Sequence, residues 1–135
     1  MSTMERILRL MAEKKASDVY LSANAPALIK INGECVPINN QILPPDAPRN
    51  LLSEVVPPDR IEELEETGDL NMGVPLSGVG RFRVSAMRQR GSYAVVIRFI
   101  SQQIPEFDSL GLPPVMRELI LEKRGLILMV GATGS

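Results

Sequence analysis

The chain has 135 residues, of which 44% are hydrophobic and only 4% aromatic, and its formal net charge is −1. This length suffices for one domain with an aliphatic core and is too short for two complete ordinary domains. The near-neutral charge gives no reason to expect nucleic acid or an acidic membrane as partner.

The sequence contains one cysteine, Cys35, and no histidine. An internal disulfide is therefore excluded, and a zinc site is not expected. Cys35 is expected to act as a small hydrophobic residue, and the reducing cytoplasm is the expected compartment.

The first third of the chain predicts a helix and a strand-rich segment. Apolar residues at helical spacing predict an amphipathic helix over residues 3–15. Strands are expected at residues 19–21 and 27–31. Asn32-Gly33 is a strong hairpin signal because both residues tolerate positive φ, so residues 34–38 are the expected return strand.

Proline pairs mark two further helices. Asp46 follows one such pair and is expected to cap a helix over residues 47–56. A second pair precedes a short helix over residues 60–67 that stops at Gly68, and the glutamates of this helix are interpreted as a solvated face.

Three strands are then expected, at residues 69–75, 80–89 and 93–100, and they predict an antiparallel meander. With the first hairpin they predict an α+β fold in which helices pack on a mixed or antiparallel sheet.

The arginines of this meander are the candidate site residues. Because side chains alternate along a strand, Arg81 and Arg83 are expected on one face, opposite the apolar residues between them. Arg98 lies among apolar neighbours and needs an anion or a carboxylate as partner. With Arg88 and Arg90, the meander concentrates five cationic groups. Two interpretations stay open: surface charge with Arg98 paired to an internal Asp or Glu, or a site for phosphate oxygens.

The last third has the pattern of a linker and a new unit. Residues 101–106 show no apolar periodicity and form the expected linker, and a helix is expected to end near Lys123. Residues 126–130 are all apolar, which is typical of a strand buried on both faces of a parallel sheet.

The final residues match the first five positions of G-x-x-x-x-G-K-[ST], a loop whose backbone N–H groups wrap nucleotide phosphates. They are Gly131, Ala132, Thr133, Gly134 and Ser135. A chance match of so short a Gly-rich stretch stays open. The apolar strand expected before it favours the phosphate loop, so the sequence is interpreted as the N-terminal part of a longer protein.

Five stretches resemble the type IV pilus retraction ATPases of the PilT/PilU family, within the secretion ATPase superfamily. They are ASDVYLS at 16–22, ING at 31–33, GRFRVSA at 80–86, LGLP at 110–113 and KRGLILMVGATGS at 123–135. The resemblance covers essentially the whole chain and is closer to the PilU branch. Tyr20 departs from the His that many members carry.

The resemblance implies a PAS-like N-terminal domain at residues 1–100 and a linker at 101–106. Residues 107–135 would be the truncated start of a RecA-like ATPase domain that ends inside the Walker A loop. It also implies that arginines of the first domain reach toward nucleotide held by the ATPase domain. The matching positions are Arg81, Arg83 and Arg98, and which of them touches phosphate stays open.

The implied parent is a hexameric, ATP-hydrolysing motor that drives pilus retraction and twitching motility, with ATP and Mg²⁺ as cofactors. Its implied partners are the other subunits of a homo-hexamer, a pilus inner-membrane platform protein and a sister retraction ATPase, and no nucleic acid. Its implied place is the cytoplasmic side of the inner membrane, at the pilus base.

The present chain alone is expected to be inactive, because no catalytic set is complete in it, and it is expected to hold no metal and no cofactor. Two alternatives stay open: a fragment of a type II secretion or pilus-assembly ATPase, and a free-standing PAS-type interaction module.

Overall fold

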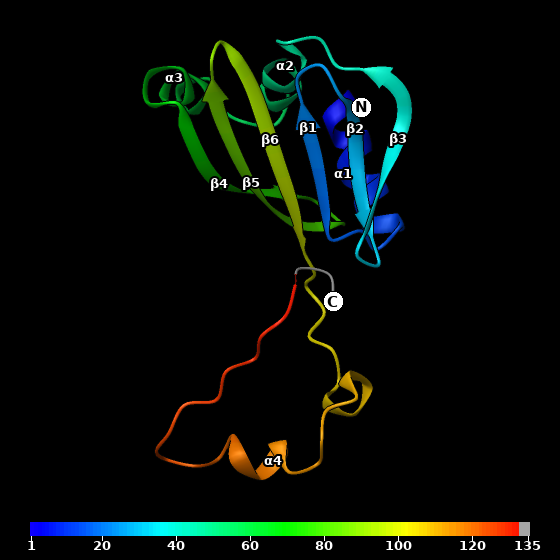
Figure 1. Cartoon of the computed structure of the whole chain (residues 1–135), viewed down its shortest axis with the longest axis vertical. Helices are drawn as coiled ribbons and strands as arrows, with labels where there is room; N and C mark the ends of the chain where they lie inside the picture. Colours follow the sequence, from blue (N-terminus) through cyan, green and yellow to red (C-terminus); the bar gives the residue numbers. More distant parts are fainter. Residues whose placement is uncertain (133–135) are drawn as a thin grey trace.

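A computed structural model describes residues 1–132, which form a six-stranded sheet with helices on one face, followed by an extended C-terminal arm (Figure 1). The elements follow in the order α1 Thr3–Glu13, β1 Asp18–Ser22, β2 Pro26–Ile31, β3 Glu34–Ile42, α2 Ala47–Ser53, α3 Pro58–Thr67, β4 Asp69–Leu76, β5 Gly80–Gln89, β6 Ser92–Ile100, the 3-10 helix η1 Phe107–Leu110, and α4 Met116–Leu119.

The strand order of the sheet is β3-β2-β1-β6-β5-β4, and each pair of neighbours is antiparallel. The α+β prediction is therefore confirmed, and the sheet is antiparallel rather than mixed. The predicted meander corresponds to β4, β5 and β6. The last strand of the meander pairs with β1, which joins the two halves of the sheet through residues about 80 positions apart, as in the pair of Asp18 with Arg98.

The first hairpin has the predicted turn and a longer return strand. Asn32 and Gly33 both have positive φ, at 50° and 84°. β3 continues beyond the predicted residue 38, because an irregularity in its register lets Ile42 pair with Pro26 of β2.

The three helices of the sheet domain differ from the predicted ones mainly at their ends. α1 ends at Glu13, and α2 ends at Ser53 instead of residue 56. Asp46 precedes α2, but its backbone is helical and its carboxylate caps no N–H group. α3 begins at Pro58, two residues before the predicted start, because proline fits the first turn of a helix. It ends before Gly68 as predicted.

The core lies between the helices and one face of the sheet. Its fully buried side chains come from both layers, and the largest are Phe82, Met4, Leu8, Met11, Leu21, Leu52, Leu64, Leu70 and Ile97. Cys35 is not part of this core, so its predicted role as a small hydrophobic residue is wrong. It is exposed, because its register partner Lys30 places it on the sheet face opposite the helices.

The C-terminal arm, residues 101–132, differs most from expectation. The predicted linker at 101–106 lies outside helices and strands and is exposed. In place of a helix reaching Lys123 there are only the four-residue η1 and α4. The apolar residues 126–130 form no strand, and their exposed fractions range from 45 to 93%. A segment that is apolar on both faces forms a strand only between neighbouring strands, and no strand among residues 1–132 pairs with residues 126–130.

Within residues 1–132 no helix has the length and apolar character needed to cross a membrane.

Candidate functional site

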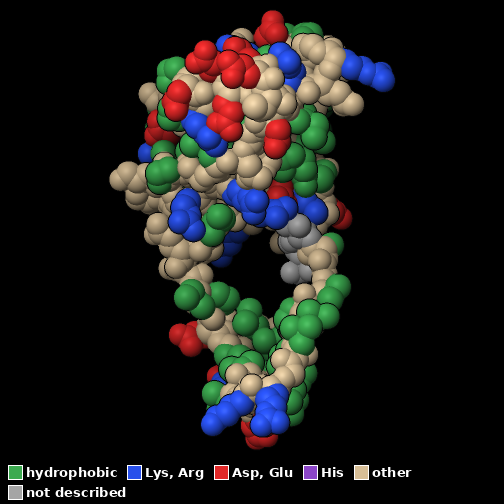
Figure 2. Space-filling model, turned by 90° about the vertical axis from the view of Figure 1, so that its left-hand side faces the viewer, with side chains coloured by type: hydrophobic (Ala, Val, Ile, Leu, Met, Phe, Trp, Pro, Cys, Tyr) green, Lys and Arg blue, Asp and Glu red, His purple; other side chains and the backbone are tan. Residues whose placement is uncertain are grey.

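The predicted arginines lie on the sheet face opposite the helices. Arg81 and Arg83 on β5 and Arg98 on β6 are exposed, whereas Phe82 and Val84 are buried. The predicted alternation along β5 is therefore confirmed. Figure 2 shows basic side chains gathered at the end of the sheet domain nearest the C-terminal arm.

Two of the arginines occupy directly opposite positions on neighbouring strands. The Cα partner of Arg83 on β6 is Arg98, and the Cα partner of Arg98 on β1 is Asp18. Like charges that face each other across two strands destabilise a sheet unless other groups compensate them. Arg83, Arg98 and Asp18, hereafter the cross-strand row, therefore form a place where positive charge is concentrated at a defined position.

The buried carboxylate of Asp18 compensates the positive charge of Arg98. Its side chain is fully buried, and its Oδ1 accepts a hydrogen bond from Arg98 Nε at 3.0 Å. Its other oxygen, Oδ2, has no hydrogen-bond partner among the described residues. The Arg98 side chain is 49% exposed, so it reaches from the buried carboxylate to the surface. The predicted pairing of Arg98 with an internal carboxylate is thus confirmed, whereas the phosphate site stays a prediction.

Arg83 is held in a similar way from the other side. Its Nε donates to Asn71 Oδ1 on β4 at 3.1 Å, and the Asn71 carbonyl accepts from Arg60 Nη2 of α3 at 3.3 Å. The two central guanidinium groups are therefore each anchored at Nε by an oxygen from the strand on their outer side.

The other three arginines of the meander are not part of this arrangement. Arg81 faces Ile100 across β5 and β6, two residues from Arg83. Arg88 and Arg90 lie at the opposite end of β5, where Arg88 pairs with Tyr93. At about 3.3 Å per residue, Arg88 is roughly 17 Å along the strand from Arg83. The predicted concentration of five cationic groups is therefore wrong, because a strand of this length spreads them over its two ends.

Asp18 and Asn71 were not among the predicted site residues. Asp18 carried a signal, since alternation places it on the face opposite the apolar Val19 at the start of a strand. Its partner could not be read from the sequence, because only the long-range pairing of β1 with β6 brings it to Arg98. Nothing in the sequence marked Asn71 as a site residue beyond its place in a predicted strand.

Tyr20 is the titratable neighbour of the cross-strand row. Burial raises the pKa of the Tyr20 hydroxyl above its ordinary value of 10.0, and the charges of Asp18 and Cys35 raise it further, while Arg98 lowers it. The hydroxyl is therefore neutral at physiological pH and can donate a hydrogen bond.

The predicted phosphate loop is described only in part. Gly131 and Ala132 are exposed and lie outside helices and strands, and Thr133, Gly134 and Ser135 are outside the described residues. In residues 1–132 no group of three His, Cys, Asp or Glu side chains is arranged to hold a metal ion.

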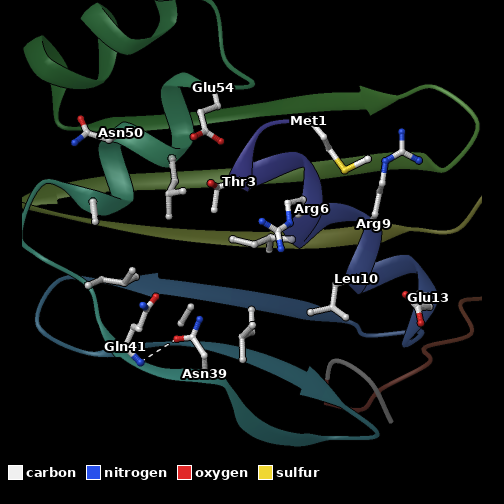
Figure 3. Close-up of a pocket in the computed structure, with 16 residues that line it drawn as sticks. Met1, Thr3, Arg6, Arg9, Leu10, Glu13, Asn39, Gln41, Asn50 and Glu54 are labelled. Atoms are coloured by element: carbon white, nitrogen blue, oxygen red, sulfur yellow. Dashed lines mark hydrogen bonds between the residues drawn. The ribbon is translucent and has the colours of Figure 1, made fainter.

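A separate hollow lies on the helix side of the sheet, on the face opposite Arg83 and Arg98. Figure 3 shows it between α1, α2 and β3. The volume of this hollow is about 770 Å³. Its apolar lining includes Ile7, Leu10, Ile38, Leu43 and Leu51, and its polar lining includes Arg6, Arg9, Glu13, Asn39, Gln41, Asn50 and Glu54. The hollow combines an apolar lining with side chains of both charges, and its lining residues show no arrangement typical of catalysis.

Two pilus ATPases are among the sequence relatives of the chain. The chain is 38% identical over 131 residues to the type IV pilus ATPase PilU of Pseudomonas aeruginosa, a match that covers 97% of the chain and 34% of that protein. It is 30% identical over 129 residues to the type IV pilus retractation ATPase PilT of the same organism, covering 96% of the chain and 38% of that protein. No family model matches the chain.

Among solved structures, the crystal structure of the pilus retraction motor PilT with bound ADP superposes with a TM-score of 0.70 at 35% sequence identity. The match covers 88% of this chain and 35% of that one. The chain thus spans about a third of the length of the curated relatives described here.

Proposed function

Because the chain is related along nearly its whole length to the PilT/PilU-like pilus ATPases, we propose that it is the N-terminal domain of a motor that hydrolyses ATP to retract a type IV pilus. The observation that carries the proposal is that sequence and fold agree on the same relative. PilT appears both among the sequence relatives and, bound to ADP, among the solved structures of similar fold.

Within this motor Arg83 and Arg98 of the cross-strand row meet the phosphates of the nucleotide. Guanidinium groups suit phosphate oxygens because their planar N–H donors form paired, charge-assisted hydrogen bonds. Arg83 and Arg98 are exposed, adjacent and anchored, which supports such a contact. Arg81, two residues along the same face, is a further donor at the margin of this surface.

Residues 101–106 act as the hinge between this domain and an ATPase domain that begins at residue 107. Their exposed backbone lies outside helices and strands, which supports a segment that can change its direction. Closure of the arginine face over nucleotide would favour one domain arrangement, and loss of the γ-phosphate would release it, because only differential contacts can shift such an equilibrium.

The whole motor works as a homo-hexamer on the cytoplasmic side of the inner membrane, against a platform protein of the pilus and together with a sister retraction ATPase. Mg²⁺ does not fit the described residues, since they offer no cluster of carboxylates for it. We therefore assign Mg²⁺ to the ATPase domain.

Steady-state ATP hydrolysis by a full-length motor carrying this chain tests the proposal. Arg98→Ala and Arg83→Ala should each lower kcat by roughly a hundredfold, the cost typical of removing one donor from a charge that develops in the transition state. Arg81→Ala should lower it less, and Arg88→Ala, at the far end of β5, is the matched control with unchanged kcat. Wild-type turnover in both Arg83→Ala and Arg98→Ala would rule out the phosphate contact.

A further inference from the structure

The two anchoring bonds of the cross-strand row share one geometry. Asp18 Oδ1 accepts from Arg98 Nε at 3.0 Å, and Asn71 Oδ1 accepts from Arg83 Nε at 3.1 Å. The accepting residues stand on β1 and β4, and the arginines stand on the central strands β6 and β5. Each guanidinium is thus fixed at its inner nitrogen from the outer side.

Such fixation has a physical purpose at a site for anions. An arginine side chain loses considerable rotamer freedom when it binds, and a partner that already holds it lowers this cost. A bond through Nε also sets the plane of the guanidinium, which decides where its terminal nitrogens can donate. Holding two like charges at opposite register positions is unfavourable in itself, so the arrangement is expected to serve a ligand that bridges them.

The burial of Asp18 supports the same conclusion. A carboxylate that only neutralised Arg98 could do so from the surface, whereas this one is fully buried with Oδ2 unpaired among the described residues. A buried oxygen without a partner lowers stability. Burying Asp18 therefore costs more stability than neutralising Arg98 requires. A buried carboxylate is, however, well placed to fix the direction of the Arg98 guanidinium.

We propose that Asp18 and Asn71 are positioning residues that fix the guanidinium groups of Arg98 and Arg83, on two neighbouring strands, to receive a polyphosphate. The inference rests on the nucleotide contact of the proposed function and assigns that contact to this arginine pair. Asp18 and Asn71 themselves touch no phosphate.

Binding of inorganic tripolyphosphate to this chain tests the inference, followed by NMR at the arginine Nε–H groups. Removal of the Asp18 carboxylate has opposite consequences under the two possible roles. If Asp18 only lowers the local positive charge, Asp18→Ala tightens binding. If it positions Arg98, the same variant weakens binding by roughly tenfold, because the ligand must then also immobilise a flexible side chain.

Further variants separate the positioning role of Asp18 from the effect of its charge and from any effect on folding. Asp18→Asn retains an acceptor without the charge and should restore part of the affinity. Asn71→Ala changes an exposed residue without altering charge and should also weaken binding, so the test survives if Asp18→Ala unfolds. Asp69→Ala, which removes a carboxylate two residues before Asn71 on the same face of β4, and Asn40→Ala, on the exposed edge strand β3, are the controls and should not weaken binding.

The Nε–H signals report position directly. Asp18→Ala should speed the exchange of the Arg98 Nε–H with water and leave that of Arg83 unchanged, and Asn71→Ala should do the reverse. Tight tripolyphosphate binding in both Asp18→Ala and Asn71→Ala would overturn this inference and leave the proposed function standing. A wild-type chain in which tripolyphosphate perturbs neither Arg83 nor Arg98 would overturn the phosphate contact as well.

Discussion

Single side chains on the outer face of the sheet depend on neighbours far away in the sequence. The sequence predicted that Arg98 needs an anion or a carboxylate, but it could not identify Asp18, because 80 residues separate the two. The faces of Arg81 and Arg83 were predictable, since alternation along a strand is a local property. The anchoring of Arg83 by Asn71 depends on the register of β4 against β5, which no local pattern determines.

Tyr20 gives the clearest prediction for pH at the scale of one residue. Its folded pKa is raised above 10.0, so the folded state holds its proton at a pH where the unfolded chain releases it. The free energy of unfolding should therefore fall as pH rises from about 10 through the folded pKa, and it should be unaffected by this group below pH 10. Urea unfolding of the wild type and of Tyr20→Phe between pH 8 and about 11 measures this.

The Tyr20→Phe protein should lose less stability over the alkaline range than the wild type, because it has no hydroxyl to ionise. Equal losses in both proteins would show that other groups cause the alkaline destabilisation.

At the scale of elements, the strands and helices of the sheet domain could be predicted because apolar periodicity, turns and prolines are local signals. Their ends were less predictable: β3 gained residues through an irregular pairing, and α2 stopped early. The apolar residues 126–130 were predicted as a strand from composition alone. Strand formation also needs neighbouring strands, and the described residues supply none there, which composition cannot reveal.

The start of β5 depends on a close approach between two strands. A Cβ at Gly80 would lie 2.8 Å from Phe99 Cε2, and Gly80 has a φ of 154°. Gly80→Ala should therefore tilt the Phe99 ring away from Phe82, whose ring centroid is 5.1 Å distant, and lower the free energy of unfolding by about 1–3 kcal/mol.

Chemical denaturation of Gly80→Ala beside Gly73→Ala measures this effect. A Cβ at Gly73, on the neighbouring strand β4, meets no atom within 4 Å, so Gly73→Ala should change stability by no more than about 0.5 kcal/mol. Equal stability of the two variants would contradict the steric argument.

At the scale of the whole molecule, the chain divides into a sheet domain and an arm with very different burial. Every residue of the core belongs to the first 100 residues, and no residue of 101–132 is buried. The domain boundary at residue 100 that the resemblance implies stays a prediction. The arm of 101–132 carries many exposed apolar side chains, and in the proposed motor the rest of the ATPase domain, to which residues 107–132 would belong, is expected to cover them.

Truncation after residue 100 tests this division. Residues 1–100 alone should unfold in one cooperative step, with the same urea midpoint and a similar m-value as the full chain, because the removed residues bury no core side chain. A midpoint lowered by more than the error of the measurement would show that the arm stabilises the sheet domain.

The central place of β6 has a mechanical consequence. β6 lies between β1 and β5, and the arm leaves directly from its last residue, Ile100. Tension applied to the arm along the strand axis loads two ladders of hydrogen bonds simultaneously and in shear, since these bonds run across the strands. Hydrogen bonds loaded in shear share the force. The hydrogen bonds of an edge strand pulled sideways would instead break one after another. The sheet is therefore built to withstand traction from its C-terminal side.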